Sequence, residues 1–260
     1  MTLVLLDKSD AVATLTLNRA GMSNALVPEL LEALLARIGE LRGDDAIRAV
    51  LLRANGEAFS LGGDMRRFRR EYDYDIVSYA AGLVGKLNEA ILAFIDLPQP
   101  VVAAVHGVVS GGAMGFVLAS DIVLAAHQVA FKAHYATAGF SPDGGWATLF
   151  ARLAGARRAS GCLLLNRAFS AEQALEWGLV NQVVAPDRLH DEALAAARKI
   201  ARYPEGSMRL SKRLLWRERD DIAAALEAER RGFLALIGIA AAREGVETFL
   251  RNFADYPDEG

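Results

Sequence analysis

The chain has 260 residues, of which 53% are hydrophobic and 23% are charged, so it can bury a substantial core and is not a disordered protein. Lys and Arg number 29 against 32 Asp and Glu, and the net charge of -3 argues against a general nucleic-acid binder. The single cysteine, Cys162, excludes an internal disulfide and a thiolate metal cluster, so we expect a reducing, cytoplasmic setting.

The N-terminus lacks the basic start and long apolar stretch of a signal peptide. No run of about 18 uncharged apolar residues follows, so the sequence predicts neither secretion nor a membrane partner. No long Gly/Ser/Pro-rich linker divides the chain, and we expect one main domain with an appendage.

The first half of the chain alternates between strand and helix patterns. Residues 3–6 and 12–17 are short apolar segments around a polar turn, which predicts a hairpin. Residues 28–41 and 76–95 carry apolar side chains at helical spacing. Further strands are expected at 47–52, 101–105 and 121–125. The order strand, helix, strand, helix, strand predicts crossover connections and a largely parallel sheet in an α/β protein.

After about residue 140 the chain is mostly helical. Apolar periodicity predicts one strand at 180–184 and helices at 146–153, 158–165, 171–177, 189–202, 208–216, 222–237 and 240–253. The last two helices carry apolar residues at helical intervals, which is typical of a core or a subunit-packing face: Leu234, Ile237, Ile239, Phe249 and Phe253.

Two glycine-bearing turns, at residues 59–65 and 107–115, each end a strand region and open a helix. N–H groups point outward at such turns, and two of them aimed at one carbonyl oxygen make an oxyanion hole. Taken singly, either turn is more often structural. Neither has the glycine spacing of a dinucleotide fingerprint or a P-loop, and Ser110 lacks the nucleophile elbow of hydrolases.

Several motifs then occur in a characteristic order, among them Leu-Asn-Arg at 17–19, Asn-Ala-Leu at 24–26, Ala-Phe-Ser-Leu-Gly-Gly-Asp at 58–64, Ser-Gly-Gly at 110–112 and Pro-Asp-Gly-Gly at 142–145. Through them nearly the whole chain resembles the enoyl-CoA hydratase/isomerase family, or crotonase superfamily. The resemblance implies a crotonase-like spiral of ββα turns over residues 1–200. It also implies a helical C-terminal region over residues 201–260 for trimerisation and active-site closure.

The resemblance implies an acyl-CoA thioester substrate, so coenzyme A enters with the substrate and no separate cofactor is expected. The oxyanion hole maps to the N–H groups of Gly63 and Gly112. Positions that hold the substrate and its coenzyme A moiety map to Met22, Ser23, Ala25, Ser60, Gly62, Asp64, Met65, Arg66 and Tyr135.

Some of these residues also have ordinary structural explanations. Asp64 is equally suited to cap a helix. A basic cluster after the first glycine turn fits a solvated face, although one of its arginines can pair with a phosphate by a forked contact: Arg66, Arg67, Arg69 and Arg70. His134 and Tyr135 can contact the acyl chain or the thioester, while packing is the more usual role. The four histidines show no metal-ligand spacing, and no metal is expected.

Hydratases of the family use two glutamates to activate and deliver water, and the matching positions here hold Gly115 and Tyr135. Glycine cannot move a proton, and tyrosine, with a reference pKa of about 10, is a poor base at neutral pH. Asp143 lies where many isomerases of the family carry a single catalytic acid, which makes it the candidate base. Pro-Asp-Gly is also a common turn, and Asp143 can cap the helix expected from residue 146.

We therefore expect an acyl-CoA double-bond isomerase in which Asp143 shuttles a proton while Gly63 and Gly112 stabilise the enolate oxygen. The alternatives are an enoyl-CoA hydratase, another lyase or dehalogenase of the family, and a pseudoenzyme that binds CoA esters without turnover. A homotrimer or a dimer of trimers is expected.

Overall fold

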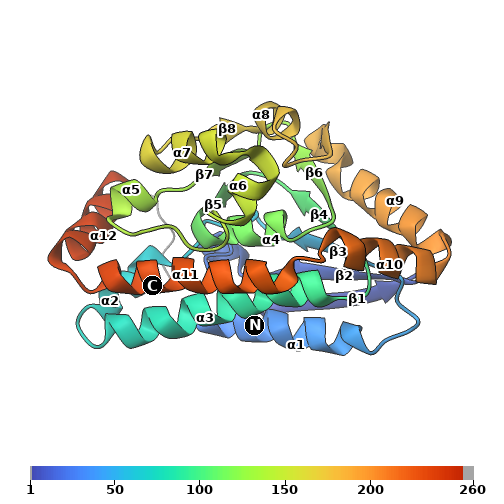
Figure 1. The fold of residues 1–260 in the computed structure, drawn as a ribbon, viewed down its shortest axis with the longest axis horizontal. Coiled ribbons are helices and arrows are strands. Elements are labelled where there is room, and N and C mark those ends of the chain that lie inside the picture. Colours follow the sequence, from blue (N-terminus) through green and yellow to red (C-terminus); the bar gives the residue numbers. More distant parts are fainter. Residues whose placement is uncertain (1, 254–260) are drawn as a thin grey trace.

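The computed structural model describes residues 2–253. A six-stranded sheet forms its centre, in the order β1 (Val4–Ser9), β2 (Val12–Leu17), β3 (Ala49–Ala54), β4 (Val101–Val105), β6 (Ile122–Ala126) and β9 (Gln182–Val184) (Figure 1). β1 pairs antiparallel with β2, and every later pair is parallel. The predicted hairpin, crossover connections and parallel sheet are confirmed.

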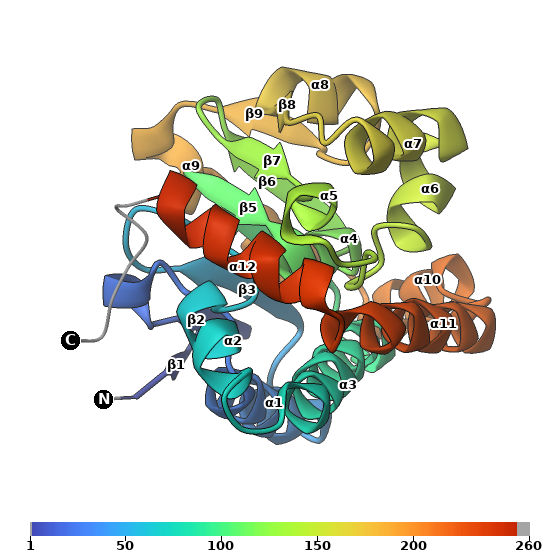
Figure 2. The ribbon, with the colours of Figure 1, turned by 90° about the vertical axis from the view of Figure 1, so that its left-hand side faces the viewer.

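Helices cover both faces of this sheet. α1 (Pro28–Arg42), α3 (Ile76–Asp96) and α11 (Arg219–Ile237) lie side by side, with α3 in contact with both neighbours, while α9 (Leu189–Arg202) packs on β3, β4 and β6 (Figure 2). The apolar stripe of α1 faces the core as its spacing predicts. α3 is long and apolar enough to cross a membrane by length and composition, a test that core helices of globular proteins also pass, and much of its surface is buried here.

A second sheet of three short strands was not predicted. It contains β5 (Val108–Ser110), β7 (Ala130–Lys132) and β8 (Phe169–Ser170). β5 leads into the short helices η2 (Gly111–Ala113) and α4 (Met114–Leu118), and β7 leads toward α5 (Tyr135–Ala138). Strands of two or three residues are too short to show an alternating pattern. Because β5 pairs with β7, this sheet places the segment that follows β5 close to the segment that follows β7, and both segments contribute to the candidate site.

The remaining elements are η1 (Ala20–Met22), α2 (Met65–Glu71), α6 (Leu149–Ala154), α7 (Ala156–Leu164), α8 (Ala171–Glu176), η3 (Pro186–Arg188), α10 (Glu205–Leu215) and α12 (Ala240–Asn252). The helix predicted from residue 146 begins only at Leu149, and the strand predicted at 180–184 is confined to 182–184. The strand predicted from residue 121 begins at Ile122. The Asp121 carboxylate instead accepts a hydrogen bond from the Val101 amide and pairs with buried Lys212.

α12 packs against both α2 and α5 and lies between them (Figure 2). Gly245 permits this contact, because a β-carbon there would lie 2.3 Å from the Ala138 carbonyl oxygen. Two ion pairs join α12 to the α2 region, Arg243 with Asp73 at 3.0 Å and Arg69 with Glu247 at 3.3 Å. The last residues of the expected C-terminal region, 254–260, lie outside the described residues.

Candidate active site

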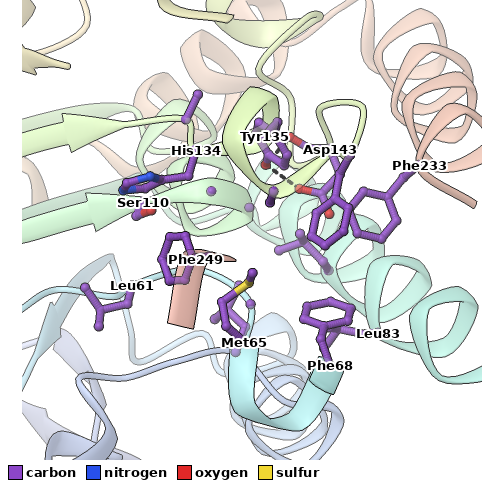
Figure 3. Close-up of a pocket in the computed structure, with 18 residues that line it drawn as sticks. Leu61, Met65, Phe68, Leu83, Ser110, His134, Tyr135, Asp143, Phe233 and Phe249 are labelled. Atoms are coloured by element: carbon purple, nitrogen blue, oxygen red, sulfur yellow. Dashed lines mark hydrogen bonds between the residues drawn. The ribbon is translucent and has the colours of Figure 1, made fainter. Parts of the chain in front are cut away.

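A small pocket, with a cavity volume of about 60 Å³, opens beside α12, at the meeting point of the two glycine turns (Figure 3). Its apolar wall is made by Leu26, Leu61, Met65, Phe68, Leu83, Leu87, Ala133, Ala138, Phe140, Phe233 and Phe249. Its polar or backbone positions are Gly63, Ser110, Gly111, Gly112, His134, Tyr135 and Asp143. A mostly apolar cavity with a few converging polar groups is the usual form of a small-molecule site.

The two glycine turns are joined to each other by backbone contacts. The Ser110 amide donates to the Ser60 carbonyl at 3.0 Å, and a β-carbon on Gly62 would lie 2.6 Å from the Ser110 carbonyl oxygen. Glycine at position 62, with φ of 78°, therefore permits an approach that no other residue would allow. As a result Gly63 and Gly112, from turns about fifty residues apart in sequence, line one cavity.

Asp143 reaches the same cavity through a second close approach. Gly144 has φ of 63°, and a β-carbon there would lie 2.6 Å from the carbonyl oxygen of Gly112. The Asp143 loop thus lies directly on the second glycine turn. A β-carbon on Gly112 would be 3.0 Å from the Asp143 Oδ1 atom, which shows how closely the carboxyl group lies to that backbone.

Tyr135 and Asp143 form a buried hydrogen-bonded pair on the pocket wall (Figure 3). The Tyr135 hydroxyl donates to Asp143 Oδ1 at 2.5 Å and lies 3.1 Å from the Asp143 carbonyl oxygen. Burial raises the pKa of Asp143 to about 7, the hydrogen bond from Tyr135 opposes that rise, and the charge of Glu229 adds to it. Burial and the nearby Asp143 charge raise the pKa of Tyr135 well above its ordinary value, so the phenol keeps its proton.

The position of Tyr135 depends on a strained residue before it. His134 has φ of 66°, in the left-handed region, and turns the chain from β7 into the short helix α5. Its ring packs edge-on against Phe249 of α12, with centroids 5.2 Å apart. Burial, together with the charge of Lys132, lowers the pKa of His134 to about 4, so this imidazole is neutral at pH 7.

Glu229, which sequence reasoning missed, holds the loop that follows Asp143. Its buried carboxylate accepts hydrogen bonds from the amides of Gly145 at 2.8 Å, Ala147 at 3.1 Å and Thr148 at 2.8 Å, and from the Thr148 hydroxyl at 2.6 Å. On the other side of the loop the Trp146 indole donates to the Gly111 carbonyl at 2.8 Å. No sequence signal identifies Glu229, because its partners lie more than eighty residues away.

Five of the predicted site residues therefore line one pocket: Gly63, Met65, Gly112, Tyr135 and Asp143. The Ser60 and Asp64 side chains are both buried and have protein partners, and their contact with coenzyme A stays a prediction. The Ser60 hydroxyl donates to the Asn24 carbonyl at 2.7 Å. The Asp64 carboxylate caps α2, as one of its two explanations predicted, and pairs with Arg19 at 2.9 Å.

The other predicted coenzyme A residues are not part of the pocket wall: Met22, Ser23, Ala25, Gly62 and Arg66. Met22 and Ala25 are buried, Gly62 forms the close turn described above, and Arg66 is a half-buried residue in the first turn of α2. Arg67 of the same basic cluster pairs with Glu71 at 2.7 Å. Contact of these positions with coenzyme A stays a prediction.

Residues 7–255 match the sequence model of a family described as Enoyl-CoA hydratase/isomerase. The chain belongs to this family. The crotonase fold expected from the sequence is thereby confirmed, and members of the family act on acyl-CoA thioesters. Within residues 2–253, no group of three or more His, Cys, Asp or Glu side chains is placed to hold a metal ion.

Individual relatives in the enoyl-CoA hydratase/isomerase family have different reactions in their names. The chain is 34% identical to 1,2-epoxyphenylacetyl-CoA isomerase of Escherichia coli, over 96% of each chain. It is 32% identical to trans-2-decenoyl-[acyl-carrier-protein] isomerase of Streptococcus mutans, over 82% of this chain and 81% of that protein. The crystal structure of an enoyl-CoA hydratase/isomerase from Xanthobacter autotrophicus superposes with a TM-score of 0.87 at 28% identity, covering 98% of this chain and 99% of that one.

Proposed function

We propose that the protein is an acyl-CoA double-bond isomerase in which Asp143 is the single proton carrier. The observation that supports this most directly is the placement of one carboxyl group, with a pKa of about 7, on an apolar pocket beside the backbone of Gly112. An acid–base group acts best when its pKa is near the working pH, because it must both take and return a proton.

The proposed reaction uses three groups of this chain. Asp143 removes the acidic proton next to the thioester, and the electron pair of that C–H bond moves onto the thioester oxygen. The N–H groups of Gly63 and Gly112 stabilise the resulting enolate oxygen, an effect for which loss of one donor typically costs about 3–4 kcal/mol. Asp143 then returns the proton further along the chain, which shifts the double bond without water.

Hydration is the less favoured reaction because neither glutamate position of a hydratase is available. A β-carbon on Gly115 would lie 2.3 Å from Ile91 Cδ1 and 2.7 Å from the Gly144 carbonyl oxygen. The space for a first glutamate is therefore filled, and Gly115→Glu would disturb the Asp143 loop instead of restoring a hydratase. At the second position Tyr135 keeps its proton and donates a hydrogen bond to Asp143.

The test compares the parent protein with Asp143→Asn on 3-enoyl-CoA substrates in deuterated water. The parent is expected to exchange deuterium into the acyl chain and move the double bond, and to hydrate 2-enoyl-CoA slowly. Asp143→Asn preserves the size of the side chain but removes the base, so turnover is expected to fall about 10²-fold or more while CoA esters still bind. Asp45→Asn, on an exposed loop, is the matched control.

Two results would contradict the proposal. Fast hydration that survives Asp143→Asn would show that another group handles water and would favour a hydratase. Measurable binding of short, long and aromatic acyl-CoAs with neither exchange nor turnover would favour a CoA-ester-binding pseudoenzyme.

A further inference from the structure

The Tyr135 hydroxyl lies next to the proposed base on the pocket wall. We propose that Tyr135 is a positioning residue, whose hydroxyl fixes the Asp143 carboxylate through Oδ1 and leaves Oδ2 as the oxygen that exchanges the proton with the acyl group. This inference rests on the proposed isomerase function, because it assigns separate tasks to the two oxygens of its base.

The geometry around Tyr135 supports a fixed donor. Its hydroxyl lies 2.5 Å from Asp143 Oδ1, and both residues are only 6% exposed. The Tyr135 ring packs edge-on against Trp146, with centroids 6.5 Å apart, and the Trp146 indole is tied to the Gly111 carbonyl. A rotation of the phenol away from Asp143 would therefore require movement of the loop that carries the base.

The hydrogen bond from Tyr135 also affects the protonation state of Asp143. Burial of Asp143 in the pocket, and to a smaller extent the charge of Glu229 of α11, favour the protonated form of Asp143, and His134 on the same wall is neutral at pH 7. Tyr135 of α5 acts in the opposite direction, since a donor to a carboxylate stabilises the ionised form. Because Tyr135 itself keeps its proton, it acts as a donor throughout the working pH range.

The proton that moves in the reaction is not the tyrosine's own. The C–H bond next to the thioester breaks, the proton passes to Asp143 Oδ2, and the electron pair forms the enolate. The Oδ2–H bond then breaks as the new C–H bond forms, and the Tyr135 O–H bond stays intact at both steps. Tyr135 therefore needs no base of its own, and its high pKa is no obstacle to the role.

Tyr135→Phe keeps the ring and removes only the hydroxyl. Loss of this donor raises the pKa of Asp143, so we expect the acidic limb of the plot of kcat/KM against pH to shift to higher pH by about one unit. A hydrogen bond to a charged group is worth about tenfold or more in an equilibrium constant. The rate is expected to fall most at pH 6 and to recover toward that of the parent at pH 9. Tyr72→Phe is the control, because the Tyr72 hydroxyl donates to the Ile237 carbonyl and Tyr72 is not among the residues that line the pocket.

A second measurement separates this inference from the proposed function. The carboxyl stretch of Asp143 is isolated by subtracting the infrared spectrum of Asp143→Asn, and its titration midpoint is expected to rise in Tyr135→Phe without any substrate. An upward shift in a protein with no isomerase activity would support the role of Tyr135 and refute the isomerase. An unchanged midpoint, with a loss of activity that is equal at every pH, would overturn the inference.

If Tyr135→Phe did not fold, 3-fluorotyrosine at position 135 would test the same interaction with the opposite sign. The fluorine makes the phenol a stronger donor while keeping the ring in place. The Asp143 midpoint is then expected to move down, and an upward or absent shift would contradict the proposed hydrogen bond.

Discussion

Asp143 binds its proton more tightly in the folded chain, where its pKa is about 7, than in the unfolded chain, where a carboxyl group has a pKa of about 4. Between these values the folded state keeps a proton that the unfolded state has lost. The free energy of unfolding therefore decreases as the pH rises from about 4 to about 7, and this contribution is constant above that window. The buried environment that gives Asp143 a pKa suited to proton transfer therefore also lowers the free energy of unfolding at neutral pH.

This linkage predicts that Asp143→Asn is more stable than the parent at pH 8. Asparagine carries no charge, and its oxygen still accepts the hydrogen bond from Tyr135. We expect a gain on the order of 2–4 kcal/mol at pH 8 that shrinks toward zero near pH 4. Thermal unfolding of both proteins across this pH range measures the difference. A difference that does not change with pH would show that burial of the Asp143 charge is not its cause.

Single residues of the site differ in how far sequence could identify them. Gly63, Gly112 and Asp143 were named because their short motifs resemble those of the family, and the structure places all three on one pocket. Tyr135 was named as a site residue, but its donation to Asp143 depends on the left-handed turn at His134, which the local sequence does not specify. The same limit applies to Asp64, where a cap and a ligand contact have the same sequence pattern.

Among the elements, the loop at residues 144–148 has little regular structure and is held by a helix far away in sequence. Glu229 of α11 accepts four hydrogen bonds from this loop, and its own pKa is raised by burial. A short loop without such an acceptor would leave several amide groups unsatisfied beside the base. The C-terminal helices therefore contribute to the chemistry by fixing the segment that carries Asp143.

Glu229→Gln is expected to weaken this arrangement strongly. The amide NH2 group replaces one acceptor oxygen and meets N–H groups that also donate, so about 1–3 kcal/mol of stability should be lost. We expect kcat to fall more than KM rises, since the base is displaced while the apolar pocket remains. Glu227→Gln, two residues earlier on α11 with a side chain that is 40% exposed, is the control. Equal kinetics for both variants would remove the positioning role of Glu229.

The elements that were predicted well are those with long repeating patterns. α1 and α3 show helical spacing over 15 and 21 residues, and β2, β3 and β4 are runs that are apolar enough to lie inside a parallel sheet. The helix predicted from Trp146 failed at its start because Gly144 and Gly145 adopt positive φ and Glu229 binds the loop amides instead. Tertiary contacts therefore determine where this helix begins, and the apolar periodicity of the sequence does not show them.

At the scale of the whole molecule, the pocket is closed by parts of the chain that are distant in sequence. Phe68 of α2, Phe140 and Phe233 of α11 form one aromatic group, with ring centroids 5.1 to 6.2 Å apart. Phe249 adds a wall from α12. The sequence predicted that the C-terminal helices carry apolar faces, but only the fold shows that two of these phenylalanines face the cavity.

Two groups of exposed leucines lie on α7 and α10, and these two helices lie apart in the fold (Figure 1). Leu164 and Leu165, at the end of α7, are 79% and 69% exposed, and Leu214 and Leu215 of α10 are 61% and 72% exposed. Contact between two unlike patches on successive copies is what a closed ring requires. The family resemblance implies trimers, and we expect the α7 patch of one chain to pack against the α10 patch of the next.

Light scattering is expected to give the mass of three or six chains at micromolar concentration. Replacing Leu214 and Leu215 by Glu should break the ring, since two charges would be buried in an apolar contact, and the same change at Leu164 and Leu165 should act alike. An equimolar mixture of the two double variants should form dimers, because each pair of chains keeps one intact contact. Tyr74→Glu, on an exposed turn, should leave the ring unchanged. A monomeric parent protein would refute both the ring and its interface.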